Sequence, residues 1–514
     1  MGIRLDRTFD VKTLLFMLAA LIFLYAVVFV PPFLPMQLNS PDGIYYIAQG
    51  QRIYEGQTIY RDFFEFVTPG AALVYALLFK LLGHRLWIPN LASLLLGLGF
   101  VWLGVRIAKK LMCPSLALLP SAIFLVGLRE WLSDPTHHWY SLLAAMAGLA
   151  VLMERRTPAR VVAAGFFCGL SACFTQTRGL AAAVGLGVFL WWESGRSQEG
   201  WRELLKKEGQ MVGGFLASLI CVNAYFIWKA GPARFLWCTV VFVLRYLPKF
   251  GSWNNIQAFA VSFTDLVMQS HSLQSSTQWA FLYVVLPLIY VLFFVRYRRQ
   301  RSRKPMEFWL RPMLVAIVGS FLLLSTAPAP SPIRVASSAL PGIILLGWFL
   351  DSPQKLARDI AATLTVGVLL IAPHAVARVQ SREKWILTTP QGTMAATDPG
   401  LVERFAWIQL HTRPGEYFYA VGPDAYFYLD LRNPTPLPRI KNNGYTTVEQ
   451  VAEVIRGLEQ HQPHYVLWPS ELGMAPDREN RPDDHLDPVR NYILSHYQKG
   501  KIFTDSAIIW ERKD

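Results

Sequence analysis

Long apolar runs alternate with short polar connections over the first three quarters of the chain. The runs are about 15 to 24 residues long, close to the ~20 residues that a helix needs to cross a bilayer. Helices satisfy their own backbone hydrogen bonds in lipid, so this pattern predicts a helical membrane bundle rather than a barrel. The first run, residues 11–34, follows Arg4, Arg7 and Lys12 and ends without a small-x-small cleavage site. It is predicted to be an uncleaved span.

One apolar run, residues 68–83, is only about 15 residues long and opens on Pro69-Gly70. If it crossed the membrane, the basic residues at 106–110 and 155–156 would lie outside, against the positive-inside rule. As an interfacial or re-entrant helix it leaves eleven spans, and every strongly basic loop, including Arg296 to Lys304, then faces the cytoplasm. The eleven are predicted at 11–34, 88–105, 114–128, 139–153, 160–175, 179–193, 209–228, 279–295, 309–326, 335–350 and 359–375. The N-terminus is then cytoplasmic, in an inner membrane.

Four segments are expected on the extracytoplasmic side: residues 35–87, 129–138, 230–278 and the tail from 376. We therefore expect a membrane domain at 1–375 and a soluble domain at 376–514. Within 230–278, the aromatic stretch Phe235 to Tyr246 suits a helix that lies on the membrane surface, or equally a structural loop packed against the tail.

The tail alternates helical and strand patterns, which predicts a small α/β layer. Helices are expected at 401–411, 447–460 and 487–497, an apolar run at 417–421, and strands at 464–468 and 506–510. No glycine-rich phosphate loop or nucleophile elbow occurs there, so no chemistry is assigned to it.

Composition agrees with a membrane protein: 53% of residues are hydrophobic and 16% charged, against about a quarter charged in soluble domains. Much of the net charge of +14 lies in short loops, where Lys and Arg set orientation, so it does not imply a nucleic-acid partner. The five cysteines contain no CxxC pair, which suggests neither a metal cage nor a disulfide framework.

Two acids in the external loops are the candidates for chemistry. Asp42 follows the first span in Pro41-Asp42-Gly43-Ile44-Tyr45, and Asp134 lies in Ser133-Asp134-Pro135. Each has a plain alternative as the cap of the helix that follows. Together, they form a pair in which one acts as a base while the other orients it or holds a cation.

His137 and His138 follow Asp134 and raise the question of a metal site, because imidazole and carboxylate both bind zinc. Adjacent histidines rarely both reach one ion, and no other histidine has an obvious claim to join them. These three residues are therefore weak candidates for a divalent cation, and no cofactor is firmly indicated.

Several short segments resemble the GT-C membrane glycosyltransferases, in particular the bacterial branch similar to protein O-mannosyltransferases and to the aminoarabinose transferases of lipid A. The similarity covers about residues 10–375. Its best segments are Pro41 to Gly56, Tyr60-Arg61-Asp62-Phe63, Pro69 to Gly83, Ser133-Asp134-Pro135 and Gly165 to Gly179.

The resemblance implies an α-helical polytopic membrane protein with a GT-C-like bundle and a small C-terminal α/β extracytoplasmic domain. It implies an inverting glycosyltransferase that moves a sugar from a polyprenyl-phosphate donor to an envelope glycan, lipid or protein acceptor on the outer face of the cytoplasmic membrane. Asp42 corresponds to the first-loop acid that activates the acceptor, and Asp134 to an acid of the second external loop.

Such a reaction also needs a cation for the departing phosphate. Arg334, which begins a span after an external connection, is the first candidate, and Arg178 the second. Both have an alternative as snorkelling interfacial arginines. Many relatives have Lys where this chain has Arg178, and no Asp-x-Asp pair flanks Asp42, which weakens the case for a metal.

Two other functions compete. A transporter or flippase of lipid-linked sugars also needs many spans and a groove for a polyprenyl chain, but transporters tend to show internal repeats and broken helices near mid-membrane. This sequence shows no repeat, and its candidate groups cluster at one face. A non-catalytic partner in envelope assembly is the third interpretation.

Overall fold

The computed structural model describes residues 10–38, 41–197, 200–269, 273–442, 444–474 and 485–513. The chain forms two compact units, which are considered separately. The bundle unit comprises residues 1–28, 91–222 and 256–381, and the loop-and-tail unit comprises 29–90, 223–255 and 382–514. The expected boundary near residue 376 remains a prediction, but the tail clearly shares its compact unit with two loops.

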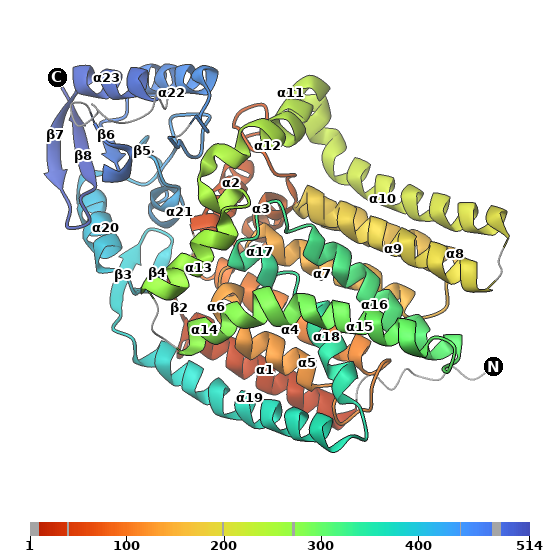
Figure 1. Cartoon of the computed structure of the whole chain (residues 1–514). Coiled ribbons are helices and arrows are strands. Elements are labelled where there is room, and N and C mark those ends of the chain that lie inside the picture. Colours follow the sequence, from red (N-terminus) through yellow and green to blue (C-terminus); the bar gives the residue numbers. More distant parts are fainter. Residues whose placement is uncertain are drawn as a thin grey trace. The chain divides into compact units, whose positions relative to one another are not determined.

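The bundle unit is helical throughout its described residues (Figure 1). Its helices are α1 (Val11–Val28), α4 (Ile88–Ala108), α5 (Leu119–Gly127), α6 (Arg129–Leu132), α7 (His137–Leu152), α8 (Pro158–Phe174), α9 (Gln176–Ser197), α10 (Trp201–Ala230), α13 (Ala258–Gln269), α14 (Leu273–Ala280), η4 (Phe281–Val285), α15 (Leu286–Gln300), α16 (Met306–Leu324), α17 (Pro332–Ala336), α18 (Leu340–Leu350) and α19 (Lys355–Ser381). Helices α7, α8, α9 and α16 pack in that order, and α1 runs beside α19.

Each of the eleven predicted spans contains one or more helices, so the predicted helical membrane fold is confirmed. The first span, expected at 11–34, is helical only to Val28, and short strands follow it. Among the described residues, six helical segments are long and apolar enough to cross a membrane. They are Val11–Val28, Ile88–Ala108, Trp201–Ala230, Ser276–Gln300, Met306–Leu324 and Lys355–Ser381. The segment expected at 114–128 is shorter, since α5 begins only at Leu119 beside Pro120.

One end of the bundle unit gathers the basic loops. Lys110 lies 2.8 Å from Glu154, and Arg156 lies 3.2 Å from Glu193. Arg311 donates to the carbonyl of Lys110 at 3.2 Å. Loops that are far apart in sequence therefore meet at the same end of the unit, as a common side of the membrane requires.

Helix α8 touches α10 with almost no space between the backbones. A methyl group on Gly165 would overlap the carbonyl of Met211, and one on Gly169 would overlap the carbonyl of Phe215. The two glycines are four residues apart and so lie on one face of α8. Small residues at this spacing allow close packing of membrane helices.

The loop-and-tail unit contains the sheet. Its elements are β1 (Phe29–Val30), β2 (Leu34–Pro35), α2 (Pro41–Tyr54), α3 (Gly70–Leu82), α11 (Pro232–Leu236), η1 (Trp237–Val241), α12 (Phe242–Arg245), η2 (Leu247–Phe250), η3 (Ser252–Asn254), β3 (Trp385–Thr389), β4 (Gly392–Ala396), α20 (Pro399–His411), β5 (Tyr419–Ala420), α21 (Asp424–Leu429), α22 (Val448–His461), β6 (Tyr465–Trp468), η5 (Ser470–Leu472), α23 (Asp487–His496), β7 (Tyr497–Ile502) and β8 (Ile508–Arg512).

The tail is an α/β layer, as predicted. Its four strands follow the order β5-β6-β8-β7, with β5 parallel to β6 and the other pairs antiparallel. Helix α22 begins with a capping box of Thr447 and Gln450 and packs beside α23 (Figure 1). The hairpin β3–β4 and strand β7 were not expected from the sequence. The core includes Val454, Trp468 and Ile493, all at most 1% exposed.

The short apolar run at 68–83 forms α3, which has 13 residues and packs against α2. A methyl group on Gly50 of α2 would come within 2.9 Å of the carbonyl oxygen of Ala72. Thirteen helical residues extend about 20 Å, less than the ~30 Å hydrocarbon core. This length agrees with the interfacial or re-entrant interpretation.

The large loop packs with the first loop and the tail. Phe242 is fully buried, and its ring lies 4.6 Å from that of Phe64 and 5.3 Å from that of Tyr445. On the opposite face, Leu236 and Leu244 are 54% and 76% exposed. The buried face of this stretch therefore packs as a structural loop. Only its exposed face is available for contact with the membrane.

Candidate functional site

The bundle unit brings together five of the candidate residues at the end opposite its basic loops: Asp134, His137, His138, Arg178 and Arg334. Asp42 belongs to the loop-and-tail unit and is described with its own neighbours.

Asp134 lies in the turn between α6 and α7 and is 4% exposed. Its backbone carbonyl accepts from the amide of Thr136 at 2.9 Å. Helix α7 begins at His137 with Thr136 in the N-cap position. The capping alternative therefore does not describe Asp134, because neither it nor Pro135 occupies the cap or the first helical position.

His137 is fixed to the end of α8. Its Nδ1 lies 2.8 Å from the hydroxyl of Thr175 and 3.2 Å from the carbonyl of Phe174. The rings of His137 and His138 lie 3.9 Å apart. Within the parts of the chain that the structure describes, no three His, Cys, Asp or Glu side chains form a group that could hold a metal ion. The weak metal assignment to Asp134, His137 and His138 gains no support from this geometry.

Arg178 is the most constrained cation of the set. It lies in the first turn of α9 and is 2% exposed. Its Nη1 donates to the carbonyl of His138 at 2.7 Å and its Nη2 to that of Arg334 at 3.2 Å. Its Nε has no hydrogen-bond partner among the described residues. A buried charge held only by carbonyls is costly unless a counter-ion joins it, so this guanidinium is suited to an anionic ligand.

Arg334 lies on the short helix α17 and is half-buried. Its Nη1 donates to the carbonyl of Ala329 at 3.2 Å. The backbone carbonyl of Arg334 accepts from Arg178, so the two residues are joined by a hydrogen bond. The sequence placed these two residues 156 positions apart, and only the fold joins them.

Asp42 lies in the first turn of α2, which begins at Pro41. It is therefore inside the helix, where a carboxylate also interacts favourably with the helix dipole. Its side chain is 55% exposed, and Arg439 Nη1 lies 3.8 Å from its Oδ1. The Arg439 guanidinium also covers the ring of Tyr45 at 5.2 Å. A solvent-accessible carboxylate beside a fixed cation can accept a proton from an incoming hydroxyl.

Glu65 is a buried carboxylate that sequence reasoning missed. It is 2% exposed, and its Oε1 accepts from the amides of Phe66 and Val67, each at 2.8 Å. Its Oε2 accepts from Gln49, and Tyr45 is a further hydrogen-bond partner. Burial raises the pKa of Glu65 to about 7 despite these bonds. A lone acid within Phe63-Phe64-Glu65-Phe66 was the available signal, because acids within aromatic runs are buried with the run.

Searches for relatives by sequence match no family model and no curated protein. Solved structures do match. ArnT from Cupriavidus metallidurans in the apo state has a TM-score of 0.62 at 13% identity, covering 97% of each chain. The same enzyme bound to undecaprenyl phosphate gives 0.58 at 11% identity, again over 97% of each chain.

The archaeal oligosaccharyltransferase AglB from Archaeoglobus fulgidus, in complex with an inhibitory peptide and a dolichol-phosphate, has a TM-score of 0.52 at 12% identity. That match covers 98% of this chain and 74% of AglB. These likenesses show the fold alone: the chain has the architecture of ArnT and AglB.

Proposed function

We propose that the protein is a GT-C glycosyltransferase that moves a sugar from a polyprenyl-phosphate donor to a cell-envelope acceptor on the outer face of the cytoplasmic membrane. The observation that carries the proposal is the likeness to ArnT over nearly the whole of both chains, including the structure bound to undecaprenyl phosphate. The buried, carbonyl-bound Arg178 supports it, because a lipid phosphate would supply the missing counter-ion.

In this proposal, Asp42 takes the proton of the acceptor hydroxyl. The acceptor oxygen then attacks the anomeric carbon, and the bond from that carbon to the phosphate oxygen breaks. The phosphate leaves with the electron pair, and Arg178 and Arg334 stabilise its charge. A single displacement of this kind inverts the anomeric configuration.

Orientation is part of the proposal: the N-terminus is cytoplasmic, and Asp134, Arg178 and Arg334 lie on the outer side. Support comes from the clustering of the basic loops at the other end of the bundle unit and from the positive-inside rule. A reporter fused after Asp514 should be active only outside the cytoplasm. Cytoplasmic activity would overturn this orientation.

The function itself is tested with purified full-length protein. Lipid that copurifies should be a polyprenyl phosphate or its sugar-linked form, identified by mass spectrometry, and the donor should be consumed when envelope acceptors are added. Reconstituted protein that moves lipid-linked sugar across vesicles without any transfer would contradict the proposal and favour a flippase.

A further inference from the structure

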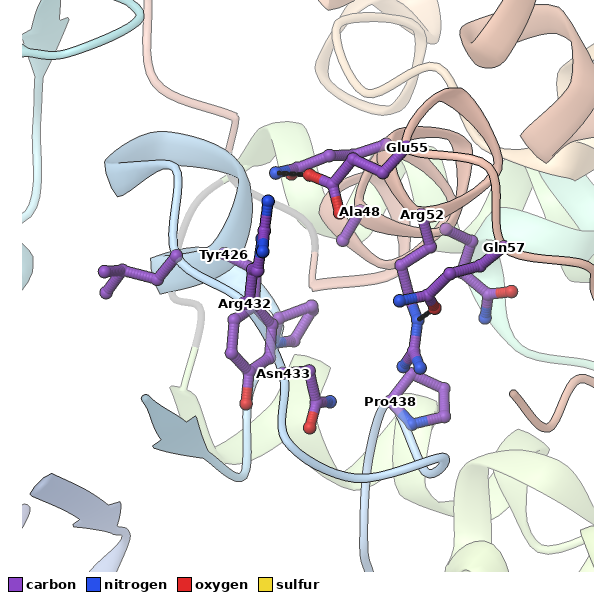
Figure 2. A pocket seen from close by; sticks show the side chains of 12 residues that line it. Ala48, Arg52, Glu55, Gln57, Tyr426, Arg432, Asn433 and Pro438 are labelled. Atoms are coloured by element: carbon purple, nitrogen blue, oxygen red, sulfur yellow. Dashed lines mark hydrogen bonds between the residues drawn. The ribbon is translucent and has the colours of Figure 1, made fainter. Parts of the chain in front are cut away.

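The loop-and-tail unit contains a small, shallow pocket that opens to solvent. One wall comes from the end of α2 and the loop after it, and the other from residues 423–438 of the tail. Figure 2 shows Arg52 and Gln57 on one side of the space and Arg432 on the other, with Glu55 along a third side.

Two polar residues of the lining already have hydrogen-bond partners within the tail. The hydroxyl of Tyr426 accepts from the Ala420 amide and donates to the Ala420 carbonyl, both at 2.8 Å. Asn433 donates to the Leu437 carbonyl at 3.0 Å and accepts from the Thr435 amide at 2.8 Å. These residues shape the tail wall and leave little capacity for a ligand.

The Arg52 guanidinium is held in place by hydrogen bonds, but not all of its N–H donors are used. Its Nε donates to Gln57 at 2.6 Å, and each Nη donates to the carbonyl of Thr435 at 3.2 Å. Its guanidinium also covers the ring of Phe63 at 4.6 Å. A guanidinium has five N–H donors, so two remain for a ligand while the group is held in a fixed plane.

Arg432 and Glu55 complete the set of available groups. Arg432 is exposed, and its guanidinium has no hydrogen bond or ion pair with the described residues. Glu55 accepts from Gln51 at 2.9 Å through Oε1, which leaves Oε2 for a donor. Burial raises the pKa of Glu55, and the positive charge of Arg432 opposes that shift.

We infer that this pocket binds an acidic sugar unit of the acceptor glycan. A ligand acid group has the oxygens to accept from Arg52 and Arg432, and a neighbouring ligand hydroxyl donates to Glu55 Oε2. Arginine favours such planar, two-point recognition of carboxylates. The link to an acceptor rests on the proposed transferase function, whereas the binding itself does not.

Glucuronate and glucose are suitable probes because they have the same ring and differ in the acid group. With purified full-length protein and saturation-transfer NMR, glucuronate should bind at least about tenfold more tightly than glucose. Arg432→Gln should raise the Kd for glucuronate about tenfold. The control is Arg456→Gln, which changes an exposed arginine of α22 outside the pocket and should leave the Kd unchanged.

Equal binding of the two sugars, or an unchanged Kd in Arg432→Gln, would overturn the inference. Inorganic phosphate that binds as tightly as glucuronate would also overturn it, because recognition would then not involve the sugar hydroxyls. Glu55→Gln should lower the affinity for glucuronate relative to that for phosphate, because the acceptor for the sugar hydroxyl changes while a negative charge beside the arginines is lost. All these measurements report binding and not sugar transfer. If glucuronate does not bind, the proposed transferase function is unaffected. If glucuronate binds but no sugar is transferred, the proposed binding site is unaffected.

Discussion

Asp42 and Asp134 look alike in the sequence, as external acids next to a helix start, but the structure gives them opposite surroundings. Asp42 is 55% exposed and faces Arg439, whereas Asp134 is 4% exposed in a tight turn beside two histidines. An exposed carboxylate can meet a substrate that arrives from solvent, and a buried one acts mainly through the groups packed around it. We therefore propose proton transfer for Asp42 and positioning for Asp134.

Asp42→Asn should produce the largest effect, a loss of about two to four orders of magnitude in transfer rate, because an amide does not accept a proton at neutral pH. Donor binding and folding should be retained. The matched control is Glu449→Gln, which makes the same change in the first turn of α22. Wild-type transfer by a donor-binding Asp42→Asn protein would show that the assigned mechanism is wrong.

Asp134→Asn should lower transfer by about two orders of magnitude through displaced neighbours. A thermal denaturation midpoint measured beside the rate separates positioning from simple unfolding. Glu130→Gln alters a 44% exposed side chain of the adjacent helix α6 and should leave the transfer rate unchanged. If Asp134→Asn changes neither the transfer rate nor the denaturation midpoint, Asp42 and Asp134 do not form a functional pair.

Arg334→Ala should raise the donor KM about tenfold, since one charge-assisted bond to phosphate is lost. The acceptor KM should stay constant, which distinguishes a donor ligand from a general structural role. Arg358→Ala, an exposed arginine of α19, serves as the control. Unchanged donor dependence would transfer the role to Arg178.

Glu65 should give the smallest effect, seen in stability against pH. Its pKa is about 7 in the folded protein and about 4.3 when unfolded, so the unfolded chain loses this proton first as pH rises. The contribution of Glu65 to the free energy of unfolding should therefore fall between about pH 4.5 and 7 and be constant on either side. Glu65→Gln should flatten that part of the melting-temperature profile, while Glu449→Gln should not.

The bundle could be predicted from the sequence because lipid imposes a strong, local rule on span length and loop charge. The tail could also be predicted from local sequence, because α22 has a clear amphipathic pattern and a capping box. Strand β7 was missed because Tyr497–Ile502 contains two lysines and a glycine, which are poor strand formers.

The site was only partly accessible to sequence reasoning. The candidate residues lie near helix ends, which the hydrophobic pattern of the sequence can locate. Their hydrogen-bond and ion-pair partners come from distant segments, which this pattern does not identify. Arg439 reaches Asp42 from the tail, and Arg178 reaches the carbonyl of Arg334 across 156 positions. The aromatic run around Glu65 indicated burial, but its hydrogen bond with Gln49 of α2 depends on the fold and could not be predicted from the local sequence.

The contact between α8 and α10 fixes the position of α8 along its own axis. With no room for even one carbon atom at Gly165 or Gly169, α8 cannot slide along α10 by a single residue without placing a side chain against a backbone. The end of α8 carries Phe174 and Thr175, which hold the ring of His137. The two glycines therefore fix the position of α8 along α10, and with it the position of the His137 ring at the end of the bundle unit.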